Sequence, residues 1–430
     1  MAVVKNRPMT RTEIEKKVQA ARGQRRPIDV RDVEKVDLTA LRASELIANS
    51  VHFEFVNLTN ADLRNGRLNE SMMKNCIIER ADFTGAQLGM AAFYDVKAAR
   101  SNFSRAELGL GNFNRSDFCE VAFDHAHLNK SDFYRCNMQG AVLTHVSAPG
   151  VGLRECDLTR ADLSNGNFCK ADFRGSRLDS ARLTKVDLSG ATLRPCVLDG
   201  AQGTGACFDH ARFEDSSAKG ADLSSASFRN AHLSETSFAR AVLRGAALDG
   251  AEGDGVEFRG ADLGGATLVG ARLDEADFRG ADLTGADLSQ GRFHSADFRG
   301  ALLTGARFDG ADCEGASFDQ GEGPAGATSS DQGHAESPLD AAAETVAREG
   351  LVALQRLLGA GGGTAAVELL DRLQRAIAQL EAAGDEPPEA WKVWLEPLMR
   401  MANGEQPLEL QAVLEALSSL AQPRPPGKEG

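Results

Sequence analysis

The hydrophobic positions of this chain repeat every five residues over most of its length. From Phe53 to Phe318, every fifth residue is Phe, Leu, Met or Ile in 48 of 54 units, and the other six are Ala, Gly or Cys. Two residues earlier, from Val51 to Ala316, all 54 units hold a small residue: Ala, Val, Ser, Gly, Cys or Thr. A helix would need a period of about 3.6 and a uniform strand one of about 2. The pattern therefore excludes a helical bundle and a flat sheet.

Each five-residue unit predicts one short extended side followed by a corner. Residues two apart on an extended segment point to the same face, so the small and the large residue both point into one interior. A tight turn at the fifth position favours glycine. Glycine is concentrated there in the second part of the repeat, at Gly245, Gly250, Gly255, Gly260, Gly265, Gly270, Gly280, Gly285, Gly300, Gly305, Gly310 and Gly315.

A second period of 20 residues predicts four sides per coil. Residues 256–263, 276–283 and 296–303 are close copies of one another. These residues resemble the pentapeptide-repeat family, whose consensus is Ala-(Asp/Asn)-Leu/Phe-x-x and whose fold is a right-handed quadrilateral β-helix. The expected fold class is therefore mainly β, a right-handed quadrilateral β-helix (pentapeptide-repeat solenoid) followed by a small all-α domain.

The pattern divides the chain into five parts. We expect a basic N-terminal leader over 1–35, with a short helix that starts at a Thr12-x-x-Glu15 capping box and ends near Arg22. The β-helix covers 36–319, a flexible linker 320–338, a helical domain 339–422 and a disordered tail 423–430. Four helices with apolar residues at helical spacing are predicted in the helical domain, which also holds both Trp residues. They form either a self-contained bundle or an interface for oligomerisation or a partner.

Charge is unevenly distributed. The chain has 62 acidic and 48 basic residues, a net charge of −14. Residues 251–319 hold 14 acids and six bases, whereas the leader has a net charge of +5. There is no apolar run of about 18 residues and no secretory signal pattern, so we expect a cytoplasmic protein.

The polar residue types that often build catalytic or metal sites fit the repeat better than any site. The eight cysteines form no CxxC pair, so free thiols are expected, with five facing inward (Cys76, Cys136, Cys156, Cys196 and Cys313). His125 and His145 lie 20 residues apart and should stack, with Arg105 below them. The pattern offers this pair no third metal ligand. No enzyme activity, cofactor or metal is expected.

A rigid solenoid without a concave pocket favours binding of another macromolecule. Outward apolar side chains, one acidic column and the two tryptophans are the candidate partner-binding residues: Phe55, Tyr94, Tyr134, Met90, Leu110, Asp254, Asp274, Glu314, Trp391 and Trp394.

The leading hypothesis is a non-catalytic protein–protein interaction scaffold whose C-terminal helices form a homo-oligomer or recruit a partner. Its partner would be another protein, with no direct contact to nucleic acid or membrane. Two alternatives stay open. The resemblance includes quinolone-resistance pentapeptide proteins, which implies a DNA mimic that binds DNA gyrase or topoisomerase. The basic leader also fits an effector or adaptor of a bacterial secretion system.

Overall fold

The computed structural model describes residues 9–21 and 32–319, all within the first of the chain's two units, Met1–Asp331. The predicted linker, helical domain and tail, with Trp391 and Trp394, lie outside the described residues. The described residues contain one helix and seven three-residue strands: α1 (Arg11–Ala21), β1 (Asp32–Glu34), β2 (His52–Glu54), β3 (Met72–Lys74), β4 (Ala92–Tyr94), β5 (Asn112–Asn114), β6 (Asp132–Tyr134) and β7 (Gly152–Arg154).

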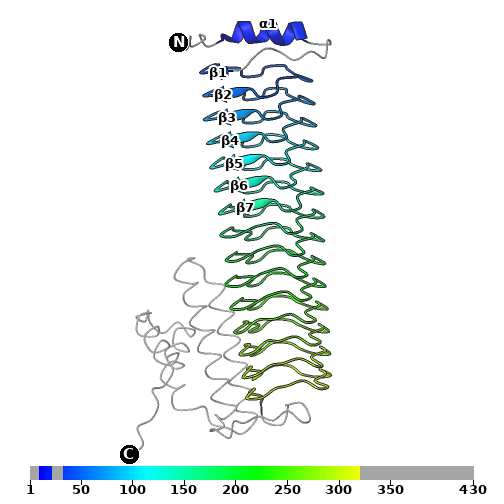
Figure 1. The fold of residues 1–430 in the computed structure, drawn as a ribbon. Coiled ribbons are helices and arrows are strands. Elements are labelled where there is room, and N and C mark those ends of the chain that lie inside the picture. Colours follow the sequence, from blue (N-terminus) through cyan, green and yellow to red (C-terminus); the bar gives the residue numbers. More distant parts are fainter. Residues whose placement is uncertain (1–8, 22–31, 320–430) are drawn as a thin grey trace, which may run out of the picture. The chain divides into compact units, whose positions relative to one another are not determined.

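Residues 32–319 form a β solenoid with 20 residues per coil (Figure 1). The seven strands make one parallel sheet in chain order, and each residue pairs with the residue 20 positions later, as Asp32 does with His52. Single parallel pairs in the same register link the other three sides and continue to Asp297 and Ser317. These 288 residues therefore make about fourteen coils. The predicted solenoid is confirmed, and β1 begins four residues before the expected boundary at residue 36.

All corners of the solenoid but one use the same backbone conformation. From Lys35 to Gly315, every fifth residue has a φ between 48° and 72°, with Pro195 as the exception. This left-handed region suits glycine, because other residues bring Cβ too close to the backbone there. Most corners after residue 240 are glycine, whereas the N-terminal half places side chains as large as Phe55 and Leu110 in the same conformation.

The interior is a set of stacked ladders. Phe238, Phe258, Phe278, Phe298 and Phe318 lie one per coil with parallel rings, and their successive centroids are 4.7–5.4 Å apart. Nearly all the large and small inward residues are buried. The repeat thus predicts the core correctly, one residue per rung.

Phe118 fills a thin place in this core. The inward large position one coil earlier holds Ala98, which the repeat would fill with Leu or Phe. The ring of Phe118 lies within 6.5 Å of the rings of Phe93 and Phe103, both in the coil of Ala98. It also contacts the rings of Phe113, Phe123 and Phe133. One aromatic side chain therefore joins two coils around the alanine.

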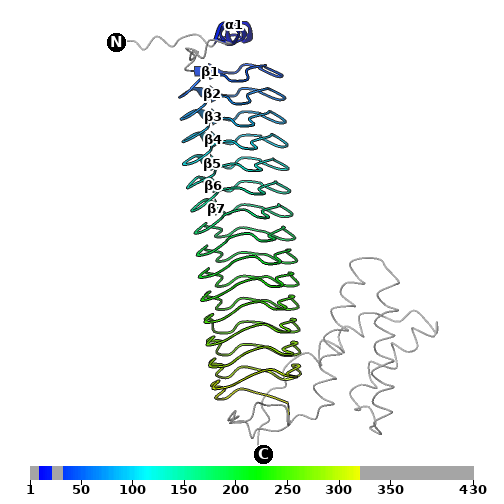
Figure 2. The ribbon, with the colours of Figure 1, turned by 90° about the vertical axis from the view of Figure 1, so that its right-hand side faces the viewer.

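Helix α1 covers the N-terminal end of the solenoid (Figure 2). Its Ile14 and Val18 are buried in the core cluster. Arg11 donates hydrogen bonds to the backbone carbonyls of Asp37 (3.5 Å) and Thr39 (3.0 Å). In later coils the equivalent carbonyls accept N–H groups from the coil before, as Asn57 does from Leu38. The guanidinium of Arg11 therefore stands in for a preceding coil.

The predicted start of this helix is wrong by two residues. The capping box is Thr10-x-x-Glu13, in which the backbone N–H of Thr10 donates to Glu13 (2.7 Å) and the backbone N–H of Glu13 donates to the Thr10 hydroxyl (3.3 Å). Thr12 lies inside the helix. The two overlapping motifs differ in the turn they start, and the one used presents Ile14 and Val18 to the first coil.

We expect Phe118→Ala to destabilise the solenoid locally by about 3–5 kcal/mol, because it removes a buried ring beside an existing thin place. Phe118→Leu should cost clearly less than Phe118→Ala, since leucine, which holds 25 of the 54 inward large positions, leaves a smaller cavity. Native-state hydrogen exchange of backbone amides in residues 91–140 measures both, because long repeat arrays need not unfold as one unit. The exposed Phe55→Ala is the control and should change stability by about 0.5 kcal/mol at most. Equal protection in Phe118→Ala and the unchanged protein would contradict this packing.

Candidate functional site

The side of the solenoid formed by β2–β7 presents two outward rows of side chains. The row at the first strand position runs His52, Met72, Ala92, Asn112, Asp132 and Gly152. The row at the third position runs Glu54, Lys74, Tyr94, Asn114, Tyr134 and Arg154. Both rows follow from the alternation of a strand, in which the middle residue points into the core.

An apolar patch lies at one edge of this side. Met72, Met90 and Leu110 are exposed by 37%, 54% and 60%. Met90 and Leu110 occupy the same corner in successive coils, and Met72 pairs with Ala92, two residues beyond Met90. We call these three residues the apolar patch. Phe55, which is 51% exposed, lies at the corner on the opposite edge of the same side.

The sequence prediction grouped these residues differently. It named Phe55, Tyr94, Tyr134, Met90 and Leu110, and it missed Met72. The signal for Met72 was available, because the 20-residue register places it beside the coil of Met90. Val142, Val269 and Leu302 are the other large apolar side chains exposed within the described ranges, and they are widely spread along the solenoid.

The two tyrosines are half-buried and contribute less to an apolar surface than their type suggests. The Tyr134 hydroxyl donates to Glu155 (3.1 Å), and Arg135 also binds this carboxylate at 2.7 Å. The guanidinium carbons of Arg135 and Arg154 lie 4.8 and 5.9 Å from the centre of the Tyr134 ring. Hydrogen bonding by Arg135 lowers the pKa of Glu155. Tyr134 therefore belongs to a charged network at the edge of this side that also carries Phe55, across from the apolar patch.

The predicted acidic column is interrupted by a histidine, and one of its carboxylates is paired with an arginine. Asp254, Asp274 and Glu314 share one row, but His294 stands between the last two in the 20-residue register. Asp274 forms an ion pair with Arg292 (2.6 Å) and accepts the backbone N–H of His294 (3.2 Å). Asp254 and Glu314 are exposed.

Arginines pair with many other acids of the C-terminal coils. At least seven of the 14 acidic residues in 251–319 have an arginine nitrogen within 4.0 Å: Asp262, Asp274, Asp277, Asp282, Asp287, Asp297 and Asp309. Exposed pairs of this kind add little stability, but they reduce the field that the carboxylates project into solvent.

The inward cysteines do the structural work of serine. The thiols of Cys136 and Cys156 donate to the carbonyls of Phe113 (3.3 Å) and Phe133 (3.4 Å). The Thr236 hydroxyl donates the equivalent bond to the carbonyl of Phe213, in the preceding coil, at 2.8 Å. All eight cysteines are free, and the five predicted to face inward are buried, as the repeat predicts.

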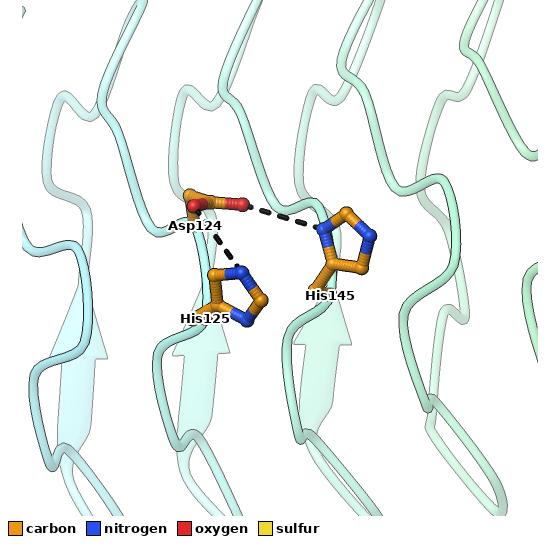
Figure 3. Close-up of side chains that lie close together, drawn as sticks. All are labelled: Asp124, His125 and His145. Carbon is orange, nitrogen blue, oxygen red and sulfur yellow. Dashed lines mark ion pairs between the residues drawn. The ribbon is translucent and has the colours of Figure 1, made fainter.

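A cluster of two histidines and one aspartate lies at another corner of the solenoid (Figure 3). The imidazoles of His125 and His145 stack with centroids 4.8 Å apart, as predicted. The carboxylate of Asp124 faces both rings, with oxygen-to-nitrogen distances of 3.8 Å to His125 and 3.5 Å to His145. The sequence prediction gave this pair no third ligand, because it searched the column 20 residues away and not the neighbouring chain position.

The family model for pentapeptide repeats matches the chain in eight copies. They span residues 52–89, 101–140, 136–175, 156–194, 181–217, 219–252, 254–290 and 292–320, which is more than half of the 430 residues. The chain belongs to the pentapeptide repeat family.

Solved pentapeptide repeat proteins resemble this chain at low identity. HetL, which takes part in regulating heterocyst differentiation in the cyanobacterium Nostoc sp. strain PCC 7120, is 22% identical; the match covers 74% of this chain and 99% of HetL, with a TM-score of 0.15. QnrB1, a plasmid-mediated fluoroquinolone resistance protein, is 20% identical over 41% of this chain and 86% of its own, with a TM-score of 0.19. The family assignment rests on the repeat match. No curated protein matches the chain in a sequence comparison.

The one helix of the described pentapeptide repeat unit, α1, has 11 residues and is too short and too polar to cross a membrane.

Thiol reactivity tests the burial of the cysteines. In the native protein we expect the half-exposed thiols of Cys119, Cys169 and Cys207 to react with an aromatic disulfide reagent, and the other five to react only after unfolding. Burial raises the pKa of Cys76, and that of Cys313 to about 11, but it also raises the pKa of Cys119 and Cys207, so access of the reagent separates the two groups. Absorbance of the released reagent counts the thiols. More than three reacting at the native rate would contradict the packing of the solenoid.

Proposed function

We propose that this pentapeptide repeat protein is a non-catalytic scaffold for protein–protein interaction, and that a protein partner docks on the N-terminal half of its solenoid over the apolar patch. The observation that supports this most directly is the concentration of exposed apolar side chains. Met72, Met90 and Leu110 lie within about two coils, next to one strand-bearing side. Contiguous exposed apolar surface of this kind is typical of an interaction site.

The backbone makes these positions costly for the chain alone. Met90 and Leu110 have φ values of 58° and 60°, where a residue with a Cβ loses about 1–2 kcal/mol relative to the usual conformation. Their backbone N–H groups donate to the next coil, to Gly109 and Asn129 (both 3.0 Å), but their side chains face water, so side-chain burial does not offset that cost. A partner that covers them would recover the hydrophobic contribution of both.

The surroundings fit a protein interface. The charged network around Tyr134 lies at the opposite edge of the same side, one coil beyond Leu110, and would supply a polar rim there. The interior is filled by side chains, so the binding surface is the outside of the coils.

Two further parts of the proposal concern the setting of the protein. We propose that residues 339–422, which include Trp391 and Trp394, form helices that self-associate or recruit a second partner. We also propose a cytoplasmic location, which is supported by eight free cysteines, because a reducing compartment keeps thiols in that state.

A DNA mimic that binds gyrase is the second candidate function. The 14 acids against six bases in residues 251–319 favour it, and QnrB1 is a fluoroquinolone resistance protein of the same family. The arginine pairs of these coils weaken it, because half of the acids have a cationic neighbour.

A pair of matched variants tests the scaffold and separates it from the DNA mimic. A partner is first isolated with the full chain and identified, and its affinity is then measured by calorimetry with purified proteins. We expect Met90→Glu with Leu110→Glu to weaken binding at least tenfold, because two charges would be desolvated at the interface. Glutamate fits these corners, since Glu70 adopts the same conformation in the same column.

Leu302→Glu is the control, because Leu302 is 58% exposed against 60% for Leu110 but lies in the C-terminal coils. It should leave the affinity unchanged. Equal binding by the double variant and the unchanged protein would overturn the proposed surface. If Asp254→Asn with Glu314→Gln abolishes binding instead, and binding falls steeply with salt, the DNA mimic is the better description.

A further inference from the structure

The Asp124, His125 and His145 cluster sits on a corner that the backbone holds firmly. His125 and His145 have φ values of 57° and 54°, and their backbone N–H groups donate to the carbonyls of Thr144 (3.0 Å) and Ser164 (3.2 Å) in the following coils. One donor atom from each of the three residues can be chosen so that all lie within 4.8 Å of one another. The side chains are 39–51% exposed, so an ion can reach them from solvent.

All three residues depart from what the repeat places elsewhere along this corner. The column of Asp124, from Arg64 to Thr304, holds Thr, Ser, Arg or Gly in all of the remaining coils. The column of His125 and His145, from Asn65 to Gly305, holds Asn, Gly, Arg, Lys or Ser in all of the remaining coils. The one carboxylate of the first column therefore coincides with the two histidines of the second.

Asp124 does not have the structural task that other aspartates on this side perform. In neighbouring coils an Asp or Asn two positions earlier accepts the backbone N–H of the fourth residue, as Asp82 does from Thr84 and Asp162 from Ser164 (both 3.0 Å). The coils of Asp124 and Thr144 have Ala122 and Val142 at that position. The carboxylate of this coil therefore stands at position 124, beside the histidines, instead of at position 122, where it would accept the backbone N–H of the turn.

The spacing of the donor atoms leaves room for an ion. A tetrahedral site with bonds of about 2.0–2.2 Å has donors roughly 3.3 Å apart, and the two Asp124 distances are 3.8 and 3.5 Å. The two distances go to different oxygens of Asp124, and the imidazole planes are 17° from parallel, so the rings must rotate for both nitrogens to aim at one ion. A second group of possible metal ligands among the described residues, His294 with Asp312 and Glu314, leaves less space between its donor atoms. Its His294 and Asp312 atoms are 2.6 Å apart, which is direct contact.

We propose that Asp124, His125 and His145 bind one divalent transition-metal ion, with two imidazoles and one carboxylate as ligands and with water at the open positions. Imidazole ligands favour zinc, nickel, copper or cobalt over calcium and magnesium, which prefer all-oxygen sites. The ion links two successive coils at their surface.

The neighbouring groups set the character of this site. Thr144 donates to Asp124 from the next coil. Burial acts to raise the pKa of Asp124, but this hydrogen bond and the neighbouring imidazoles outweigh it, and the pKa is lowered. Arg105 lies one coil before His125 in the same column. Its positive charge repels cations that would bind by charge attraction alone, without coordination by imidazole nitrogens. Asn165 follows His145 on the other side and carries an amide oxygen.

The test is a titration of the full chain with Zn²⁺, and with Co²⁺ for its visible absorption, after removal of metal by a chelator. The repeat itself supplies variants that suit the backbone: Asp124→Thr, His125→Asn and His145→Asn, because Thr144 and Asn165 hold the same positions in adjacent coils. We expect one ion at this corner in the unchanged protein and at least tenfold weaker binding in each variant. Zinc should also raise the unfolding temperature of the unchanged protein only.

Two control variants test whether binding is specific to this cluster. His210→Asn removes an exposed corner histidine elsewhere and should leave binding unchanged. His294→Asn removes the second group, so any ion held there is counted separately. Circular dichroism and unfolding in chelator should be the same for all variants. Unchanged zinc affinity in the three cluster variants would overturn the proposal. Loss with either histidine variant but full binding by Asp124→Thr would overturn the carboxylate's part in it.

Discussion

The left-handed residue at every fifth position is the constraint on which the rest of the solenoid depends. It turns the chain by the same amount at each corner, so that residues 20 apart meet in parallel register from Asp32 to Ser317. A unit with one residue more or fewer would move every later large side chain out of the core. The unbroken count of five is therefore a packing requirement, and it converts chain position directly into a place on the surface.

This regularity explains why so much of the fold is predictable from sequence. The inward cysteines, the phenylalanine ladders and the stacked histidines all follow from counting by five and by 20. Features that depend on contacts between different columns are not predictable in this way. Asp124 joins His145 across a corner and across a coil, and Arg292 neutralises Asp274 from the neighbouring row. Counting along one column does not reveal either contact.

The start of α1 shows a second limit. Thr10 with Glu13 and Thr12 with Glu15 both satisfy the capping pattern, and local sequence does not rank them. The choice depends on a distant surface, because the helix must turn Ile14 and Val18 toward the first coil and bring Arg11 to its carbonyls.

The two halves of the solenoid also differ in the residue types at their corners, a difference that the five-residue period does not reveal. The C-terminal corners are mostly glycine, while several N-terminal corners carry large side chains in a conformation that glycine adopts at less cost.

The contact between Arg11 and the first coil has a consequence for assembly. The end coil of a β solenoid is an open sheet edge, and its carbonyls are a template on which another chain can add. Arg11 occupies two of those carbonyls, and α1 covers the apolar rungs behind them. These contacts oppose the end-to-end addition of another chain at the N-terminal end, because part of the open edge already has a partner within the same chain.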